Sequence, residues 1–175
     1  MYKITIKQGD IFSENSANFI VNPSNTDLIL GSGVSAAFRS NCGNELQKEM
    51  KKQAPIKQGD VIVTSCAVNT SFKNALHVAV MDYSKATPSP SYETIKKALE
   101  NIENIIKTKT PCKMVMPLIG VGVGGLDKEK VIQIYKEFFS RNVDFNCEVV
   151  IYGYKKENYH LLKKIFNRRI NEYFG

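Results

Sequence analysis

Apolar segments of strand length alternate with amphipathic segments of helix length along the chain, and this pattern constrains the fold more than any other feature. Strands are predicted at residues 2–7, 18–22, 60–68, 74–81, 112–119 and 147–152. Helices are predicted at residues 33–41, 44–52, 91–107, onward from Asp127, and at 156–172. Nearly continuous apolar strands that alternate with helices are typical of a sheet covered on both faces. We therefore predict an α/β fold, a three-layer α/β/α sandwich with a mixed, mostly parallel central sheet.

Three segments refine this prediction. Residues 60–81 hold two valine-rich strands separated by a turn, and this pair is expected to supply the antiparallel part of the sheet. The strand at 18–22 is expected to end at Pro23. In the helix at 91–107, apolar residues recur at spacings of four, three and four and form one face: Ile95, Leu99, Ile102 and Ile106.

The length of 175 residues fits one domain, so residues 1–175 are predicted to form a single unit. A hydrophobic content of 43% is sufficient for a buried core. No apolar run approaches the roughly 18 residues that a membrane-spanning helix needs. The first ten residues, MYKITIKQGD, lack the apolar segment of a signal peptide. We expect a cytoplasmic protein without a membrane partner.

The four cysteines, at positions 42, 66, 112 and 147, are too far apart in sequence to resemble a zinc motif or a redox dithiol. All four are expected to be structural, with Cys66 and Cys147 as buried free thiols beside strands. The sequence gives no metal site and no cofactor motif. The net charge of +7 suits an anionic ligand, a nucleic acid or an acidic partner, and does not choose among them.

Two glycine-bearing loops follow predicted strands. The first contains Gly31-Ser32-Gly33, and the second runs from Ile119 to Gly125. Ligands of open α/β sheets bind at the carboxyl ends of strands, and glycine lets backbone N–H groups approach an anion closely. A helix follows each loop and adds its positive N-terminus. The two loops are predicted to close on a diphosphate from both sides, although an ordinary turn is the alternative role of either.

Five short motifs follow one another along the chain: Gly9-Asp10-Ile11, Ile20-Val21-Asn22-Pro23-Ser24-Asn25, Gly31-Ser32-Gly33-Val34 with Gly43, Ile56-Lys57-Gln58-Gly59, and Pro117 through Gly125. In their sequence and order they resemble the motifs of the macro domain, the ADP-ribose-binding module. The second of these resembles the family's Val-Asn-Ala-Ala-Asn, and the third resembles its Gly-Gly-Gly-Val. The chain resembles the family over residues 3–165. The resemblance implies the macro-domain fold and binding of ADP-ribose, free or attached to a protein.

The resemblance also implies roles for individual residues. Asp10 would accept a hydrogen bond from the adenine amino group beside the N–H of Ile11, while Asn22 and Asn25 would lie at the ligand, Asn25 on the distal ribose. Backbone amides would clasp the diphosphate in two runs: Gly31, Ser32, Gly33, Val34 and Ser35, and Gly120, Val121, Gly122, Val123 and Gly124. Tyr154 would stack on adenine. The alternatives are a plain turn for Asp10, an Asx turn for Asn25 and a rim or core position for Tyr154.

The residues that make some relatives hydrolytic are missing. Ser35 and Arg39 stand where one branch has Asp and His, and Gly124 stands where another branch has Asp. Serine cannot replace a carboxylate as general base near neutral pH. His77 is expected in the core and His160 near the surface. Binding is therefore predicted, and the catalytic residues stay unknown.

Two alternatives remain open at the level of the sequence. The first is enzymatic: removal of ADP-ribose from proteins, or of phosphate from ADP-ribose 1″-phosphate. The second is binding of nucleic acid by basic residues near the C-terminus: Lys155, Lys156, Lys163, Lys164, Arg168 and Arg169.

Overall fold

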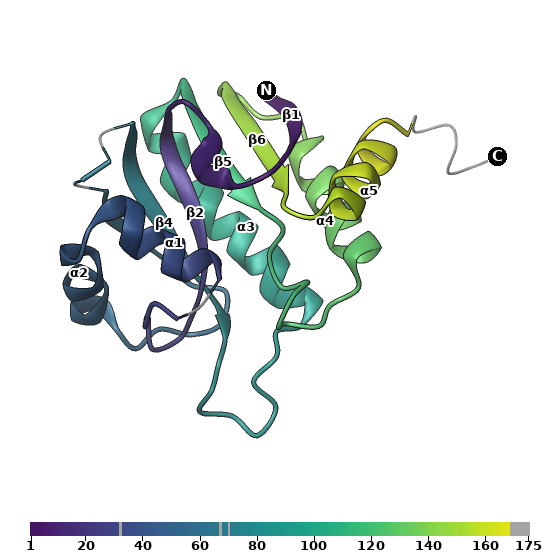
Figure 1. Ribbon diagram of the computed structural model, residues 1–175. Helices are drawn as coiled ribbons and strands as arrows, with labels where there is room; N and C mark the ends of the chain where they lie inside the picture. Colours follow the sequence, from purple (N-terminus) through teal and green to yellow (C-terminus); the bar gives the residue numbers. More distant parts are fainter. Residues whose placement is uncertain (32, 67, 70, 169–175) are drawn as a thin grey trace.

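A computed structural model, which describes residues 1–31, 33–66, 68–69 and 71–168, contains a six-stranded sheet between two layers of helices (Figure 1). The strands are β1 (Tyr2–Gln8), β2 (Ala17–Asn25), β3 (Val61–Ser65), β4 (Phe72–Met81), β5 (Cys112–Pro117) and β6 (Cys147–Gly153). Their order is β1-β6-β5-β2-β4-β3, and every neighbouring pair is parallel except β3 with β4. The predicted mixed, mostly parallel sheet is confirmed, including its antiparallel pair within residues 60–81.

The helices form the two outer layers. The short helix η1 (Ile11–Ser13), α1 (Val34–Cys42) and α2 (Glu45–Gln53) pack on one face of the sheet, and α3 (Tyr92–Ile106), α4 (Lys128–Phe139) and α5 (Lys156–Phe166) pack on the other. A second short helix, η2 (Lys107–Lys109), extends α3. The three-layer α/β/α sandwich is confirmed.

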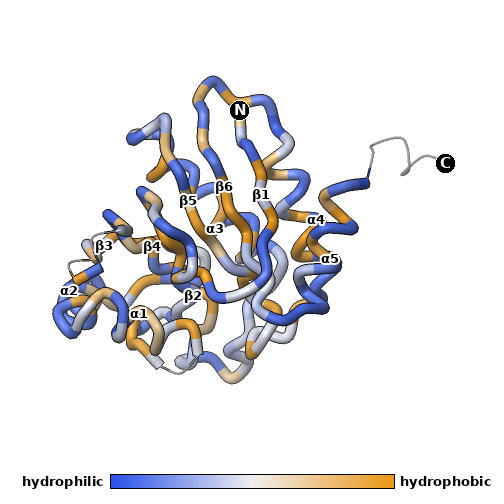
Figure 2. The backbone as a smooth tube through the Cα atoms, turned by 45° about the horizontal axis from the view of Figure 1, so that its top comes forward, coloured by the Kyte–Doolittle hydropathy of each residue, from blue (hydrophilic) through white to orange (hydrophobic). Residues whose placement is uncertain are grey.

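A hydrophobic core lies on each face of the sheet, because successive side chains along a strand point to opposite faces. In β6, Val149 and Ile151 pack under α3, α4 and α5, while Val150 and Tyr152 pack under α1 and α2. Figure 2 shows the same distribution by hydropathy: hydrophobic residues lie along the central parts of β5 and β6, and mostly hydrophilic residues lie along α2. Among the described residues, no helix combines the length and hydrophobicity needed to cross a bilayer.

Helix α3 forms as its sequence predicts. The Ser91 side chain accepts from the Thr94 N–H, and the Thr94 side chain accepts from the Ser91 N–H, so that a capping box fixes the start of the helix. The predicted apolar face is buried to 1% exposure or less. The final helix is shorter than predicted: it ends at Phe166, and the predicted positions 169–172 lie outside the described residues.

Strand β2 is longer than predicted, because it continues through Pro23 to Asn25. Pairing with β5 involves Phe19 and Ile20, whereas pairing with β4 continues to the end of the strand. The β5 side of the ladder ends before Pro23, so a residue without an N–H group is tolerated there. The extra residues bring Ser24 and Asn25 to the carboxyl edge of the sheet.

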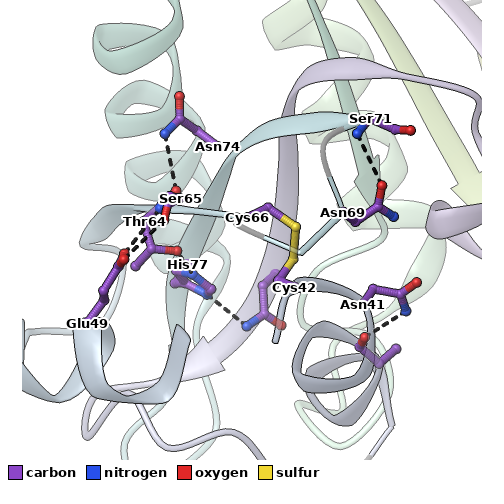
Figure 3. The surroundings of a disulfide bond; sticks show 12 residues. Asn41, Cys42, Glu49, Thr64, Ser65, Cys66, Asn69, Ser71, Asn74 and His77 are labelled. Atoms are coloured by element: carbon purple, nitrogen blue, oxygen red, sulfur yellow. Dashed lines mark hydrogen bonds between the residues drawn. A yellow bond between two sulfur atoms is a disulfide. The ribbon is translucent and has the colours of Figure 1, made fainter. Parts of the chain in front are cut away.

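The cysteines are paired in space. Cys42, the last residue of α1, forms a disulfide with Cys66, which follows β3 (Figure 3). The expectation that Cys66 is a free thiol is therefore wrong, and a sequence separation of 24 residues gave no sign of the bond. Cys147 is a buried free thiol, as predicted, and lies next to the thiol of Cys112 at a sulfur–sulfur distance of 3.4 Å. The disulfide joins α1 to the β3 side of the sheet.

Gly153 allows α5 to approach the end of β6. A Cβ atom at this position would lie 2.4 Å from the backbone nitrogen of Tyr159, a distance that side chains do not tolerate. The Gly153 carbonyl also accepts from the Gly9 N–H at 3.0 Å. This close packing brings the loop after β1 and the first turn of α5 to the same corner of the molecule.

Candidate functional site

Five parallel strands end at one edge of the sheet, and a cleft with two connected lobes lies there. The Asp10 lobe, of about 400 Å³, is lined by the loops after β1 and β6. The Asn25 lobe, of about 520 Å³, is lined by the loops after β2 and β4. Both lobes share four lining residues, which form the saddle between them: Gly33, Val34, Leu118 and Gly122. The cleft is therefore continuous from Asp10 to Asn25.

The Asp10 lobe holds the three residues that were predicted to contact adenine, Asp10, Ile11 and Tyr154. One carboxylate oxygen of Asp10 accepts from the Phe12 N–H at 2.8 Å and caps η1. The predicted turn role of Asp10 is thus present, and the second carboxylate oxygen has no hydrogen-bond partner among the described residues. Tyr154 lies at the rim with 76% of its surface exposed.

A buried carboxylate fixes the wall of the Asp10 lobe. Glu14, which directly follows η1, accepts from Lys7 at 2.9 Å, from Lys113 at 3.1 Å and from the Tyr152 hydroxyl at 2.8 Å. Burial alone would raise the pKa of Glu14, but the hydrogen bonds from Lys7, Tyr152 and Lys113 outweigh it and lower the pKa to about 2. Because Tyr152 lines the lobe, this cluster holds the loop after β1 against β6.

Asn25 shapes the second lobe through its own turn. Its side-chain carbonyl accepts from the Ile29 N–H at 3.2 Å, and its amide group donates to the Ile29 carbonyl at 3.0 Å. Leu28, inside this turn, has a φ of +55°, and the two hydrogen bonds hold the loop in that conformation. Asn25 also lines the lobe, so it combines a local backbone-capping role with a place in the cleft.

Ser35 is buried at the wall of the Asn25 lobe, and its hydroxyl is hydrogen-bonded within the protein. The oxygen lies 3.1 Å from both the Asn22 side-chain carbonyl and the Pro23 carbonyl, and its single proton can be donated to either one. Asn22 has no exposed surface and lines neither lobe. Its place among the ligand contacts stays a prediction, and within the structure its side-chain carbonyl lies beside the Ser35 hydroxyl while its amide group contacts His77.

His77 contacts this amide group and is a core residue, as expected. Asn22 donates its amide proton to His77 Nδ1 at 2.9 Å, so the Nε2–H of His77 donates to the Thr64 hydroxyl at 2.8 Å. Burial lowers the pKa of His77 to about 3, so the ring is neutral at physiological pH. With both ring nitrogens occupied, His77 is not available as a catalytic base.

The first glycine loop meets the saddle at a helix N-terminus. Gly33, with a φ of +65°, precedes the first residue of α1, Val34, and both residues line both lobes. Gly31 lines the Asn25 lobe, whereas the predicted contact Ser32 lies outside the described residues. The backbone N–H groups at the start of α1 have no helical acceptor, which favours an anion at the saddle.

The second glycine loop forms a tight turn, in which the Leu126 N–H donates to the Gly120 carbonyl at 3.0 Å. A Cβ atom at Gly124 would lie 2.6 Å from the same oxygen, so this turn leaves no room for a side chain at that position. The loop lines the cleft with Gly120, Val121, Gly122, Val123 and Gly124. Its following helix, α4, contributes no lining residue within the described chain, so the part of that helix N-terminus in anion binding stays a prediction.

Each lobe contains a buried polar atom that lacks a partner. In the part of the chain that the structure describes, the buried side-chain oxygens and nitrogens without a hydrogen bond are Ser24 Oγ and Asn158 Oδ1. Ser24 lines the Asn25 lobe and Asn158 lines the Asp10 lobe. An unpaired buried polar atom costs roughly 1–3 kcal/mol, so it normally has a water or a ligand as partner. Each lobe of the cleft therefore offers an unpaired hydrogen-bonding atom to a polar molecule.

Sequence reasoning missed several lining residues. Ser24 stands inside a motif that was used for the prediction but was given no role of its own, and Asn158 lies four residues after the predicted Tyr154 and outside every motif. Asp27 and Tyr83 come from the loops after β2 and β4, and no motif marks them.

The comparisons with known proteins agree with the fold. The Macro domain family profile matches residues 21–135, so the chain belongs to this family. An uncharacterised protein of Aquifex aeolicus is 32% identical over 126 residues, covering 72% of this chain and 74% of its own. The O-acetyl-ADP-ribose deacetylase 1 of Pantoea vagans is 28% identical over 174 residues, covering 95% of this chain and 100% of its own.

A solved structure shows the same fold. A mutant macrodomain of Oceanobacillus iheyensis with ADPR superimposes with a TM-score of 0.77 at 24% identity, covering 92% of this chain and 90% of its own. At this identity the likeness establishes the architecture. The individual contacts of this chain follow from its own cleft.

Proposed function

We propose that the cleft binds ADP-ribose, with adenosine in the Asp10 lobe, the diphosphate across the saddle and the distal ribose in the Asn25 lobe. The observation that carries this proposal is the pair of unpartnered buried atoms, Ser24 Oγ and Asn158 Oδ1, one in each lobe of a continuous cleft. A ligand that is polar at both ends and anionic in the middle satisfies both atoms and the N-terminus of α1 together. Membership of the Macro domain family supports the same ligand.

Adenine recognition is assigned to the loop after β1. The free carboxylate oxygen of Asp10 accepts from the adenine amino group, and the Ile11 N–H donates to the adjacent ring nitrogen. Guanine carries a carbonyl at this edge, which a carboxylate repels. Tyr154 supplies an exposed ring at the rim, and stacking of a base on an aromatic ring is worth roughly 1–3 kcal/mol.

Binding of ADP-ribose without rapid hydrolysis is the better supported of the two candidate functions. The deacetylase named among the relatives makes enzymatic turnover the second candidate. In this chain, however, the Ser35 hydroxyl is directed to Asn22 and Pro23, and Gly124 has no room for a side chain. Neither position that carries a carboxylate in hydrolytic relatives therefore offers a general base.

Nucleic-acid binding is supported less well. The exposed lysines Lys155, Lys156, Lys163 and Lys164 lie on or beside α5, and of these Lys155 lines the cleft. Arg168 is 3.8 Å from Glu129, and Arg169 lies outside the described residues. The cytoplasmic location and the single-domain organisation stay predictions from the sequence.

Calorimetric titration with ADP-ribose, ADP and AMP tests the proposal. We expect affinity to rise from AMP to ADP to ADP-ribose, because each ligand fills one further part of the cleft. ADP-ribose should bind at least about tenfold more tightly than AMP, which corresponds to roughly 1.4 kcal/mol. Equal affinity for all three would contradict the two-lobe arrangement, and the absence of heat and of a thermal shift with ADP-ribose would refute the function.

A further inference from the structure

The Asn25 lobe has more room than a ribose fills. At about 520 Å³ it is larger than the Asp10 lobe, at about 400 Å³. The proposed function, on which this inference rests, places adenine and a ribose in the smaller lobe and a single ribose in the larger one. Space beyond the distal ribose is therefore available for a group that is attached to it.

The residues around this extra space have a distinct chemistry. Of the described residues that line the Asn25 lobe, Asp27 carries the one formal charge at neutral pH, in a protein of net charge +7. Asp27 is exposed, and its side chain has no hydrogen bond or ion pair with another described residue. A carboxylate that has no such partner among the described residues is available to an external cation.

Apolar side chains surround this carboxylate. Tyr83 is 57% exposed, Ile29 is 50% exposed and Val123 is 82% exposed, and all three line the same lobe. They come from three separate loops, after β4, β2 and β5, so they frame the mouth of the lobe from different sides. Large hydrophobic residues that gather in the open around one cleft are typical of a surface that binds another molecule.

We propose that the Asn25 lobe receives ADP-ribose attached to an arginine side chain of a protein. The guanidinium, which keeps its positive charge after one nitrogen is joined to the ribose, pairs with the Asp27 carboxylate in a fork geometry. Its planar face lies against the Tyr83 ring, and its aliphatic stem lies on Ile29 and Val123. A serine or glutamate linkage leaves no cation at this position, so it forfeits the pairing with Asp27 and with the ring.

Three peptides of one sequence test the proposal, each with ADP-ribose on a single residue that is arginine, serine or glutamate. Titration of the complete protein should show the arginine peptide binding roughly fivefold more tightly than the serine peptide, as an exposed ion pair and a cation–π contact together provide. In Asp27→Asn this ratio should fall to roughly twofold, because the ion pair is lost while the contact of the guanidinium with the Tyr83 ring remains. The matched variant Asp144→Asn, which removes an exposed carboxylate before the opposite end of β6, should keep the ratio.

The outcomes separate this inference from the proposed function. Equal affinity of wild type for the three peptides, together with tight binding of free ADP-ribose, overturns the arginine subsite and leaves the proposed function standing. A ratio that Asp27→Asn does not change also overturns it. Failure of free ADP-ribose and of all three peptides to bind overturns the proposed function and this inference together.

Discussion

Replacement of Glu14 by alanine is expected to lower the free energy of unfolding by about 3 kcal/mol. The side chain is 4% exposed and accepts hydrogen bonds from Lys7, Lys113 and Tyr152, so the variant leaves two ammonium groups and a hydroxyl without their anion. Breaking a buried ion pair by removing one partner typically costs this much. Chemical denaturation followed by circular dichroism measures the change. Glu100→Ala, on the exposed side of α3, is the matched control and should stay within about 0.5 kcal/mol of wild type.

The same carboxylate predicts an acid dependence. The folded pKa of Glu14, about 2, lies below the ordinary glutamate value near 4.5, so its contribution is complete above pH 4.5 and is lost as the pH falls toward 2. The decrease in unfolding free energy across this window should be smaller in Glu14→Gln than in wild type by roughly 3 kcal/mol. Parallel pH profiles of the two proteins would contradict the arrangement of the cluster.

Asp10→Asn is expected to reverse the preference of the cleft among bases. The asparagine side chain still caps η1 through its carbonyl, but its amide now faces the adenine amino group donor to donor. Loss of a hydrogen bond to a charged acceptor costs about 1.5–3 kcal/mol, so affinity for ADP-ribose should fall roughly 10- to 100-fold. The hypoxanthine analogue of ADP-ribose, which presents a carbonyl at that edge, should bind the variant better than it binds wild type.

Calorimetry with both ligands measures this change of preference. Asp144→Asn again provides a control with the same change of charge, away from the carboxyl edge of the sheet. An equal loss of affinity for both bases in Asp10→Asn would assign Asp10 to the turn alone.

The sequence predicts the fold well because its signals are local. Each helix and strand carries its own period, and the capped, amphipathic α3 forms where the pattern places it. Pro23 misled the prediction because its tolerance depends on where the ladder between β2 and β5 ends, which is a property of the whole sheet. The disulfide was missed for the same reason, since Cys42 and Cys66 meet only after α1 packs beside β3.

The candidate site also contains residues that the sequence predicts and residues that only the tertiary structure brings together. The glycine loops and Asp10 stand in short motifs, and the structure brings them to one cleft. Asp27 and Tyr83 face this cleft from two loops whose sequences carry no motif, so their meeting depends on the neighbouring positions of β2 and β4. Asn22 stands in the motif but is buried, because it lies further from the carboxyl end of β2 than Ser24 and Asn25 do, and its amide meets His77.

The central claim is that one ligand occupies both lobes at once, and amide NMR spectra of the ¹⁵N-labelled protein during titration with ADP-ribose test it most directly. Signals of Ile11 in the Asp10 lobe, Gly122 at the saddle and Ser24 in the Asn25 lobe should shift together and saturate with one dissociation constant. Signals of Glu100 and Asp144 should stay in place. Shifts confined to the lysine-rich face of α5, or no shifts at all, would contradict the proposed binding mode.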